Sequence, residues 1–495
     1  MTLTPLITAA EGFPALEKLV ASADTELLMS FRILDPQTRL RSDELTSEGL
    51  ETWGDLLAHV ARKGVRLRMV LADFDPVFTS TLHRLAWASA SRFAEKASGD
   101  VGIICAPHGQ EAGWFWRLAM RGQIGSRLAE LRDEDPADLT PLQRAALEGA
   151  VRLRPVTIHQ KFAVADGARC VIGGLDINER RFDTPEHDRP AEETWQDVSM
   201  QVEDADFSAA LRLHFAETWN AALDCGAPCL TGTAERLATD TRPQTAADLK
   251  LVRTFSAPCP GAVRLGPRSV AIDHEKATLS MIGEAERHIY VETQFLRHKP
   301  IADALVRAAD RHPDLQLVMI LPPAADRVLF DGDDGWDARH AHSLQWQALE
   351  RLRKAFDDRL ALISPARKSS SQDEVATLHG AQPIYVHSKV MLVDDRVGMV
   401  GSANLNGRSM RWDTEASVMF RRPDDVENLR IRLARAWLGP QAEGKDCTLA
   451  KVWRQAALTN AARAPEQRES FVLPYPLATA RKFSRRFPLL PDEMF

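Results

Sequence analysis

The sequence predicts an α/β protein made of two similar lobes, each a mixed β-sheet flanked by helices, packed around a pseudo-twofold axis. Three observations predict this fold. A His-x-Lys pattern occurs twice, with Asp five residues after the Lys and Gly seven residues after the Asp in both copies. Two apolar segments precede each copy in the same order. Helical patterns alternate with these segments, which is typical of a sheet with helices on both faces.

The elements of the two lobes follow the same order. Each lobe has an early helical pattern, at residues 13–20 and 274–286, and Pro14 suits a first helical turn. Apolar runs without a helical period then predict strands at residues 25–33, 64–71, 287–295 and 314–321. We expect a first lobe, a linker rich in Ala, Thr, Pro and Gly, a second lobe and a C-terminal extension, at residues 1–225, 226–250, 251–440 and 441–495.

The duplicated pattern places one imidazole beside one ammonium group in each lobe. Its copies are His159, Lys161, Asp166 and Gly173, and His387, Lys389, Asp394 and Gly401. The residues after each Lys predict a buried strand, and strand side chains alternate, so the His and Lys of one copy share a face. If the copies face each other, two imidazoles and two ammonium groups surround a volume that suits a phosphate. We expect the glycine-rich turns to add backbone N–H donors.

Two imidazoles permit a two-step displacement at phosphorus. One attacks as the free base and forms a phosphohistidine, while the other, protonated, donates to the leaving oxygen and then deprotonates the incoming water or alcohol. Each imidazole needs a partner on its second nitrogen. Asp197 and Glu415 are placed to supply these partners, because each begins an apolar or alternating run after its motif. We expect neither a metal nor another cofactor.

Asp166 and Asp394 have two interpretations. As members of the repeated pattern they are candidate catalytic residues. Each also lies where its strand would end, and Asp166-Gly167 is a common turn pair. We favour the structural role but keep both among the candidate site residues.

These residues closely resemble the phospholipase D superfamily, whose mark is a duplicated His-x-Lys-x4-Asp-x6-Gly-Ser-x-Asn pattern. Further segments resemble the eukaryotic and plant-type enzymes, namely residues 173–177, 181–187, 195–197, 289–295, 386–409 and 413–415. The resemblance implies the phospholipase D fold and a phosphodiesterase that acts through phosphohistidine, most often on phospholipid head groups. In the family the N-terminal His is usually the nucleophile, which corresponds to His159, with His387 as general acid and base. The residues of this chain alone leave the two roles interchangeable.

One departure from the family pattern concerns the phosphate contacts. The first copy has Gly174 and Asp176 where the pattern has Ser and Asn, a form that eukaryotic-type enzymes share. Ser402 and Asn404 of the second copy are therefore the better candidates for polar contacts to the phosphate. The candidate phosphate-binding set comprises these four residues and the two motif lysines.

Composition and charge limit the class of partner. The chain has 495 residues, which is enough for two large cores. Its composition, with 44% hydrophobic and 26% charged residues, is typical of a soluble globular protein. A net charge of −7 argues against nucleic acid, because a nuclease needs a basic surface. We expect no membrane span and no cleavable signal peptide. The protein is then cytoplasmic, or exported without such a peptide, a monomer, and peripheral at membranes that contain its phospholipid substrate.

Two further segments bear on membrane contact. Trp114, Phe115 and Trp116 either pack in the core, which we favour, or line an acyl or head-group pocket. The stretch 480–487 mixes four cations with two Phe, which suits a membrane surface. We favour a solvated, partly packed tail for it.

Three functions remain open. The leading one is a phospholipase D that cleaves the head-group phosphodiester of glycerophospholipids to phosphatidic acid, with head-group exchange when an alcohol replaces water. The second is a phosphatidyltransferase of the cardiolipin synthase kind. The third is a non-catalytic module that binds nucleic acid or a membrane. The lipid assignment rests on the resemblance alone, whereas the phosphoryl chemistry rests on the paired motif.

Overall fold

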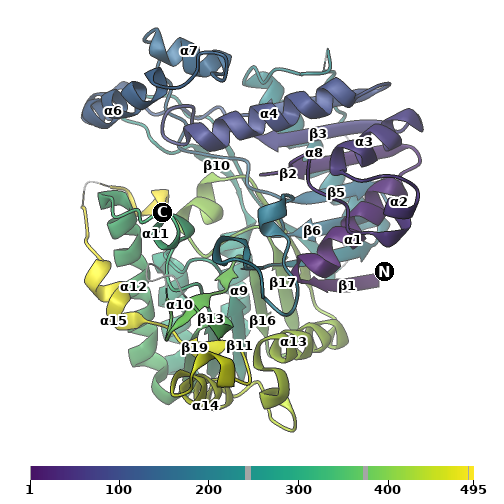
Figure 1. The fold of residues 1–495 in the computed structure, drawn as a ribbon. Helices are drawn as coiled ribbons and strands as arrows, with labels where there is room; N and C mark the ends of the chain where they lie inside the picture. Colours follow the sequence, from purple (N-terminus) through teal and green to yellow (C-terminus); the bar gives the residue numbers. More distant parts are fainter. Residues whose placement is uncertain (1, 233, 240–246, 372–376, 489) are drawn as a thin grey trace.

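Two β-sheets, each surrounded by helices, form the two lobes of the molecule (Figure 1). The computed structural model describes residues 2–232, 234–239, 247–371, 377–488 and 490–495. Residues 233 and 240–246 of the predicted linker lie outside the described residues.

The first sheet has seven strands in the order β1-β8-β6-β5-β2-β3-β4. Their bounds are β1 Thr2–Ile7, β2 Glu26–Phe31, β3 Arg66–Ala72, β4 Val101–Ala106, β5 Phe162–Ala165, β6 Arg169–Gly173 and β8 Val198–Glu203. β2, β3 and β4 run parallel, and β5, β6, β8 and β1 continue the sheet through antiparallel pairs. All residues of β2 and β5 are buried, as their largely apolar runs predict.

The second sheet repeats this order strand for strand, as β9-β18-β17-β16-β11-β12-β13, with β10 and β14 at its edges. Its strands are β9 Leu249–Ala257, β10 Arg268–Ile272, β11 His288–Glu292, β12 Gln316–Ile320, β13 Leu360–Ser370, β14 Ala381–Pro383, β16 Val390–Val393, β17 Val397–Gly401 and β18 Glu415–Phe420. β19 (Val472–Pro474) pairs with β13, so part of the predicted C-terminal extension belongs to this sheet.

Helices flank both sheets (Figure 1). The N-terminal lobe carries α1 Thr8–Ala21, α2 Asp43–Ser47, α3 Trp53–Arg62, α4 Ser80–Lys96, α5 Trp114–Ala119, α6 Arg121–Arg132, α7 Pro141–Leu147 and α8 Ala205–Asp224. The C-terminal half carries α9 Asp273–Glu284, α10 Lys299–Arg311, α11 Asp326–Leu329, α12 Trp336–Phe356, α13 Pro423–Leu438, α14 Ala450–Ala461 and α15 Leu477–Phe483. Within the described part of the chain, no helix has the length and apolar character needed to span a bilayer.

The first helix begins earlier than the sequence predicts. α1 starts at Thr8, so Pro14 lies inside the helix and not in its first turn. The Glu11 carboxylate accepts the N–H of Ile7 at 2.8 Å, which places a negative charge in the first turn. Proline removes one N–H donor from a helix interior.

The two lobes meet through β6 and β8 of the first sheet and β17 and β18 of the second. One hydrophobic cluster includes Val198 and Met200 from the first lobe and Val400 and Val418 from the second. A short parallel pair, β7 (Trp195–Gln196) and β15 (Tyr385–Val386), also joins them. The repeated strand order confirms the predicted fold class, two similar α/β lobes related by a pseudo-twofold axis.

Candidate active site

Both His-x-Lys motifs lie in extended segments directly before a central strand. Lys161 precedes β5 and Lys389 precedes β16. The imidazoles of His159 and His387 line one pocket of about 650 Å³, whose walls come from both lobes. The structure therefore brings two residues far apart in the sequence to a single site.

Backbone pairing between the lobes places His387 opposite an acidic residue of the first lobe. Val386 pairs with Gln196 in the parallel β15–β7 pair, so the next residues, His387 and Asp197, lie opposite each other. The His387 N–H also donates to the Gln196 carbonyl at 2.8 Å. As a result, Nδ1 of His387 lies 2.7 Å from Oδ2 of Asp197.

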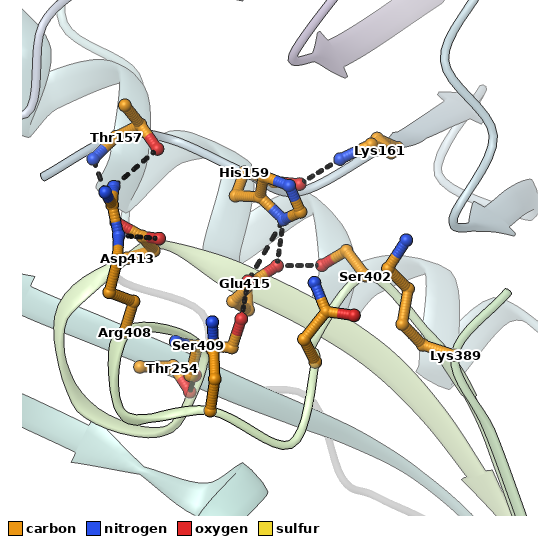
Figure 2. A network of polar contacts seen from close by, with 12 residues as sticks. Thr157, His159, Lys161, Thr254, Lys389, Ser402, Arg408, Ser409, Asp413 and Glu415 are labelled. Atoms are coloured by element: carbon orange, nitrogen blue, oxygen red, sulfur yellow. Dashed lines mark hydrogen bonds and ion pairs between the residues drawn. The ribbon is translucent and has the colours of Figure 1, made fainter. Parts of the chain in front are cut away.

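The first motif has the reciprocal arrangement. Ile158 forms a parallel bridge with Thr414, and the N–H of His159 donates to the Thr414 carbonyl at 2.8 Å. This register brings Nδ1 of His159 to 3.1 Å from Oε2 of Glu415, as Figure 2 shows. Each imidazole thus has its carboxylate partner in the other lobe. Neither Nε2 atom makes a hydrogen bond within the described residues, which leaves it free for a ligand.

Ser402 contacts this carboxylate and does not line the pocket. Its hydroxyl donates to Oε2 of Glu415 at 2.5 Å, and Ser409 donates to Oε1 at 2.7 Å (Figure 2). The expectation of a direct Ser402 contact to phosphate is therefore wrong for this geometry, because the hydroxyl is already used to hold Glu415.

The motif lysines lie behind the imidazoles. The ammonium group of Lys161 donates to the carbonyl of His159 at 2.6 Å, and that of Lys389 donates to the carbonyl of His387. Both side chains are buried. Their charge reaches the pocket at short range, although their hydrogen bonds within the chain go to the motif backbone.

Burial and these cations shift the proton equilibria of the site. The pKa of each imidazole lies well below its ordinary value, because burial and the nearby motif lysines disfavour the imidazolium. Burial raises the pKa of Asp197 to about 6 and that of Glu415 to about 8, and it lowers the pKa of Lys389 to about 7. The imidazoles are therefore free bases at neutral pH, as nucleophilic attack requires.

The N–H groups of the motif glycines are engaged within the chain and are not available to a phosphate. The N–H groups of Gly173 and Gly401 donate to the carbonyls of Lys161 and Lys389, and that of Gly174 donates to the carbonyl of Val198. Gly174 is needed for space, because a Cβ atom there would lie 2.2 Å from Oδ1 of Asp197. The residue therefore lets the Asp197 carboxylate approach His387 and does not bind phosphate itself.

Asp176 and Asn404 occupy equivalent positions in the two lobes but differ in their contacts. Asn404 lines the pocket and donates to the side-chain oxygen of Gln294 at 3.2 Å. Asp176 is fully buried, accepts the N–H of Ile33 at 3.2 Å and lies 3.9 Å from the ammonium group of Lys161. Asn404 thus remains a candidate phosphate contact, whereas Asp176 is a partner of Lys161 and not of an anion.

The structure does not bring Asp166 and Asp394 to the pocket. Each lies at the far end of the strand after its motif, with φ of 54° and 53°. Asp166 accepts the N–H groups of Asp24, Thr25 and Glu26, which lead into β2. Asp394 does the same for residues 286–288 at the start of β11. Their inclusion among the catalytic residues was wrong, and their role is to hold the ends of two central strands.

We expect Asp394→Ala to lower the free energy of unfolding by about 3 kcal/mol, because it removes a charged acceptor from three backbone N–H groups. Burial raises the pKa of Asp394, but the N–H of His288 and the Arg396 guanidinium outweigh it, so the pKa is lowered overall. This contribution to stability is present above the unfolded pKa of about 3.9 and is lost as the pH falls through the lower folded value. Urea unfolding at neutral and acid pH measures both effects. A large loss of turnover in the folded variant would contradict the structural role.

The sequence analysis did not identify Arg32 and Arg181 as pocket residues. Arg32 follows β2, at the position that Gln294 occupies in the second lobe, and Arg181 follows β6. Both line the pocket, and within the described residues neither guanidinium has an ion pair. Arg181 is 6% exposed, its Nε and Nη1 atoms have no hydrogen-bond partner, and it lies 3.4 Å over the Trp195 ring. A lone Arg in a sequence has no distinctive spacing, so the one available indication was the location of Arg181 in a segment that resembles the family.

Comparison with known proteins finds similarity to one family. The family model described as "Cardiolipin synthase, PLD-like domain" matches residues 278–437. Phospholipase D1 of Schizosaccharomyces pombe is 24% identical over 344 residues, which cover 52% of this chain and 24% of the relative. Phospholipase D1 of Saccharomyces cerevisiae is 25% identical over 376 residues, which cover 57% of this chain and 22% of the relative. The matches thus span less than a quarter of these relatives.

A solved structure supports the fold. The crystal structure of phosphatidylserine synthase from Haemophilus influenzae Rd KW20 aligns with a TM-score of 0.54 and 13% sequence identity, and the alignment covers 88% of this chain and 86% of that chain. The two lobes with their paired motifs define a protein of the phospholipase D fold. The family model and these relatives support an assignment of the chain to the phospholipase D superfamily.

Proposed function

We propose that this chain is a phospholipase D-type phosphodiesterase that hydrolyses the head-group phosphodiester of glycerophospholipids to phosphatidic acid. The observation that carries the proposal is the pair of imidazoles in one pocket, each bonded through Nδ1 to a buried carboxylate of the other lobe. This arrangement fixes both rings and leaves both Nε2 atoms available to one phosphoryl group.

In the first step, Nε2 of His159 attacks phosphorus as the free base. The bond from phosphorus to the head-group oxygen breaks, and His387, protonated on Nε2, donates its proton to that oxygen. The products are a phosphatidyl group bonded to His159 and the free head-group alcohol. The anionic diester raises the pKa of the nearby imidazole of His387, which offsets the effect of the lysines and favours the protonated form.

In the second step, His387 acts as a base. It takes a proton from water as the water oxygen attacks phosphorus, and the bond from phosphorus to Nε2 of His159 breaks. Phosphatidic acid leaves, and both imidazoles return to their starting states. An alcohol that replaces water gives head-group exchange by the same bond changes.

The negative charge of the reacting phosphate needs more cations than the motifs supply. The two motif lysines lie near three buried acidic side chains, those of Asp176, Asp197 and Glu415. The guanidinium groups of Arg32 and Arg181, which form no ion pair within the described residues, add positive charge to the pocket. We assign them to the non-bridging phosphate oxygens, together with the lysines.

The membrane setting follows from this substrate class and remains a proposal. The chain would act at the surface of a phospholipid membrane, and we propose no role for nucleic acid. The monomeric state stays a prediction.

Product analysis tests the proposal. We expect the purified chain to release phosphatidic acid and free head group from vesicles of mixed phospholipids, and to form a phosphatidyl alcohol when ethanol or glycerol is added. Mass spectrometry of the lipids identifies these products. Formation of cardiolipin or another phosphatidyl conjugate without phosphatidic acid would support the transferase alternative instead. Vesicle or DNA binding without any diester cleavage would overturn the enzymatic proposal.

A further inference from the structure

A group of exposed apolar side chains lies on α5 and the adjacent loop of the second lobe. The exposed fractions are 55% for Trp114, 46% for Phe115, 54% for Leu118 and 68% for Val263. We call these four residues the rim patch. The prediction that Trp114 and Phe115 pack in the core is wrong, because only Trp116 of that aromatic run packs against a buried cluster.

The rim patch is held in place by the chain around it. The N–H of Gly113 donates to the Arg264 carbonyl at 2.7 Å, and the N–H of Phe115 donates to the Ala262 carbonyl at 3.1 Å. The Trp116 indole donates to the Val263 carbonyl at 2.9 Å. The exposed side chains therefore belong to a fixed surface, and an exposed apolar surface of this kind marks a site of interaction.

The rim patch borders the pocket that contains the two imidazoles. α5 is flanked by Ala112 and Met120, which both line that pocket, and Leu265, two residues after Val263, lines it as well. Whatever covers the rim patch therefore lies at the mouth of the candidate active site.

Arginines surround these apolar side chains. Arg117, Arg121 and Arg264 are exposed, and the side chains of the last two have no partner within the described residues. Residues 114–132 contain four Arg and one Glu, a net charge of +3 in a chain of net charge −7. Aromatic and aliphatic side chains flanked by Arg are the composition of membrane-surface segments, where apolar groups enter the interface and guanidinium groups meet anionic head groups.

We propose that the rim patch docks the protein on a bilayer that contains anionic phospholipid. Trp114, Phe115, Leu118 and Val263 insert at the level of the head groups, Arg117, Arg121 and Arg264 contact lipid phosphates, and the pocket mouth faces the lipid surface. The purpose of this docking rests on the proposed lipid function, whereas the binding itself requires no catalysis.

The basic C-terminal stretch is a weaker candidate for this role. The Phe483 ring contacts the His342 ring at 4.8 Å between centroids, and the Phe487 ring contacts that of Trp336 at 6.1 Å. Its two aromatic side chains are therefore engaged within the protein, which agrees with the prediction of a solvated, partly packed tail.

Vesicle binding and soluble turnover, measured on the full chain, test the proposal. We expect Trp114→Ser/Leu118→Ser to lower partitioning onto phosphatidylcholine–phosphatidylglycerol vesicles by about tenfold or more. Turnover of the soluble diester bis(p-nitrophenyl) phosphate should stay unchanged, because neither residue lines the pocket. Arg117→Gln/Arg121→Gln should weaken binding to these vesicles but not to pure phosphatidylcholine. Leu458→Ser is the matched control, since Leu458 is 60% exposed on α14.

Two results would overturn the docking proposal. One is the absence of vesicle binding by the unaltered chain, which would leave the rim patch to a protein partner. The other is wild-type partitioning of the Trp114→Ser/Leu118→Ser variant. Vesicle binding without diester cleavage would instead count against the proposed function while the docking surface stands.

Discussion

We expect His159→Asn and His387→Asn each to lower kcat for phospholipid hydrolysis by about 10⁴-fold or more, because each removes a group that forms or breaks a bond to the reacting phosphate or its leaving group. The loss should be in kcat and not in KM, since the arginines and lysines around the phosphate are unchanged. Asparagine keeps a polar side chain at each site. Its amide can donate a hydrogen bond to the buried carboxylate partner, which would otherwise lose its hydrogen bond.

The two variants should differ in the covalent intermediate. With bis(p-nitrophenyl) phosphate, the leaving group needs no protonation, so His387→Asn should still form a phosphoryl adduct on His159. The adduct should then persist, because no base activates water. Intact-protein mass spectrometry after acid-free quenching should find the adduct on His387→Asn and none on His159→Asn. This pair of measurements assigns the nucleophile, which the symmetry of the two motifs leaves open.

A third His provides the control. His379 is exposed, does not line the pocket, and has a φ of 49°, a conformation that Asn accepts readily. His379→Asn should therefore match the unaltered chain in turnover and adduct formation. An adduct found on His159→Asn and not on His387→Asn would reverse the two roles, and full activity of either motif variant would contradict the proposed mechanism.

The repeated strand order could be predicted from local pattern. The apolar runs at residues 64–71 and 314–321 are short, lack a helical period and precede their motifs at equivalent places, and they form β3 and β12. The periods of helix and strand are properties of the chain over a few residues, so they are visible without tertiary information.

The position of Asp166 and Asp394 outside the site could also be predicted from the sequence. A strand rises about 3.3 Å per residue, so an Asp five residues after the Lys lies roughly 16 Å from it.

The partner of each imidazole could not be predicted. Asp197 and Glu415 were both evident as candidates, but the match of His159 with Glu415 joins residues 256 positions apart. It depends on a parallel bridge between the lobes, and a bridge of this kind has no local sequence pattern. The prediction that the aromatic side chains of α5 are buried failed for a related reason. An aromatic run predicts burial by composition, whereas its exposure depends on which neighbours the fold provides.

Replacement of the cross-lobe carboxylates is expected to have the second large effect on kcat. Oδ1 of Asp197 accepts the N–H of Val198 at 3.1 Å. In Asp197→Asn the amide oxygen would keep this bond, and the amide nitrogen would therefore face Nδ1 of His387. An N–H donor at that position opposes the imidazolium form, so Nε2 carries only the proton of a neutral ring, which is too weakly acidic to protonate the leaving head group. We expect kcat for phospholipid hydrolysis to fall by about 10³-fold to 10⁴-fold.

Glu415→Gln should cause a loss of similar size by a different route. An amide N–H facing Nδ1 of His159 places the ring proton on Nε2, so the atom that attacks phosphorus loses its lone pair. This defect does not depend on the leaving group. The two variants therefore distinguish the residue that positions the general acid His387 from the residue that positions the nucleophile His159.

Pre-steady-state kinetics with bis(p-nitrophenyl) phosphate distinguishes the two cases. Asp197→Asn should release a burst of p-nitrophenol close to one equivalent per protein and then turn over slowly. His159 can still attack phosphorus in this variant, whereas hydrolysis of the resulting phosphohistidine is impaired. Glu415→Gln should show no burst. Asp224→Asn, an exposed carboxylate outside the pocket, should behave as the unaltered chain. A burst in Glu415→Gln and none in Asp197→Asn would mean that His387 is the nucleophile. Equal wild-type rates in both variants would show that the buried carboxylates hold the lobes together and take no part in setting the imidazole protons.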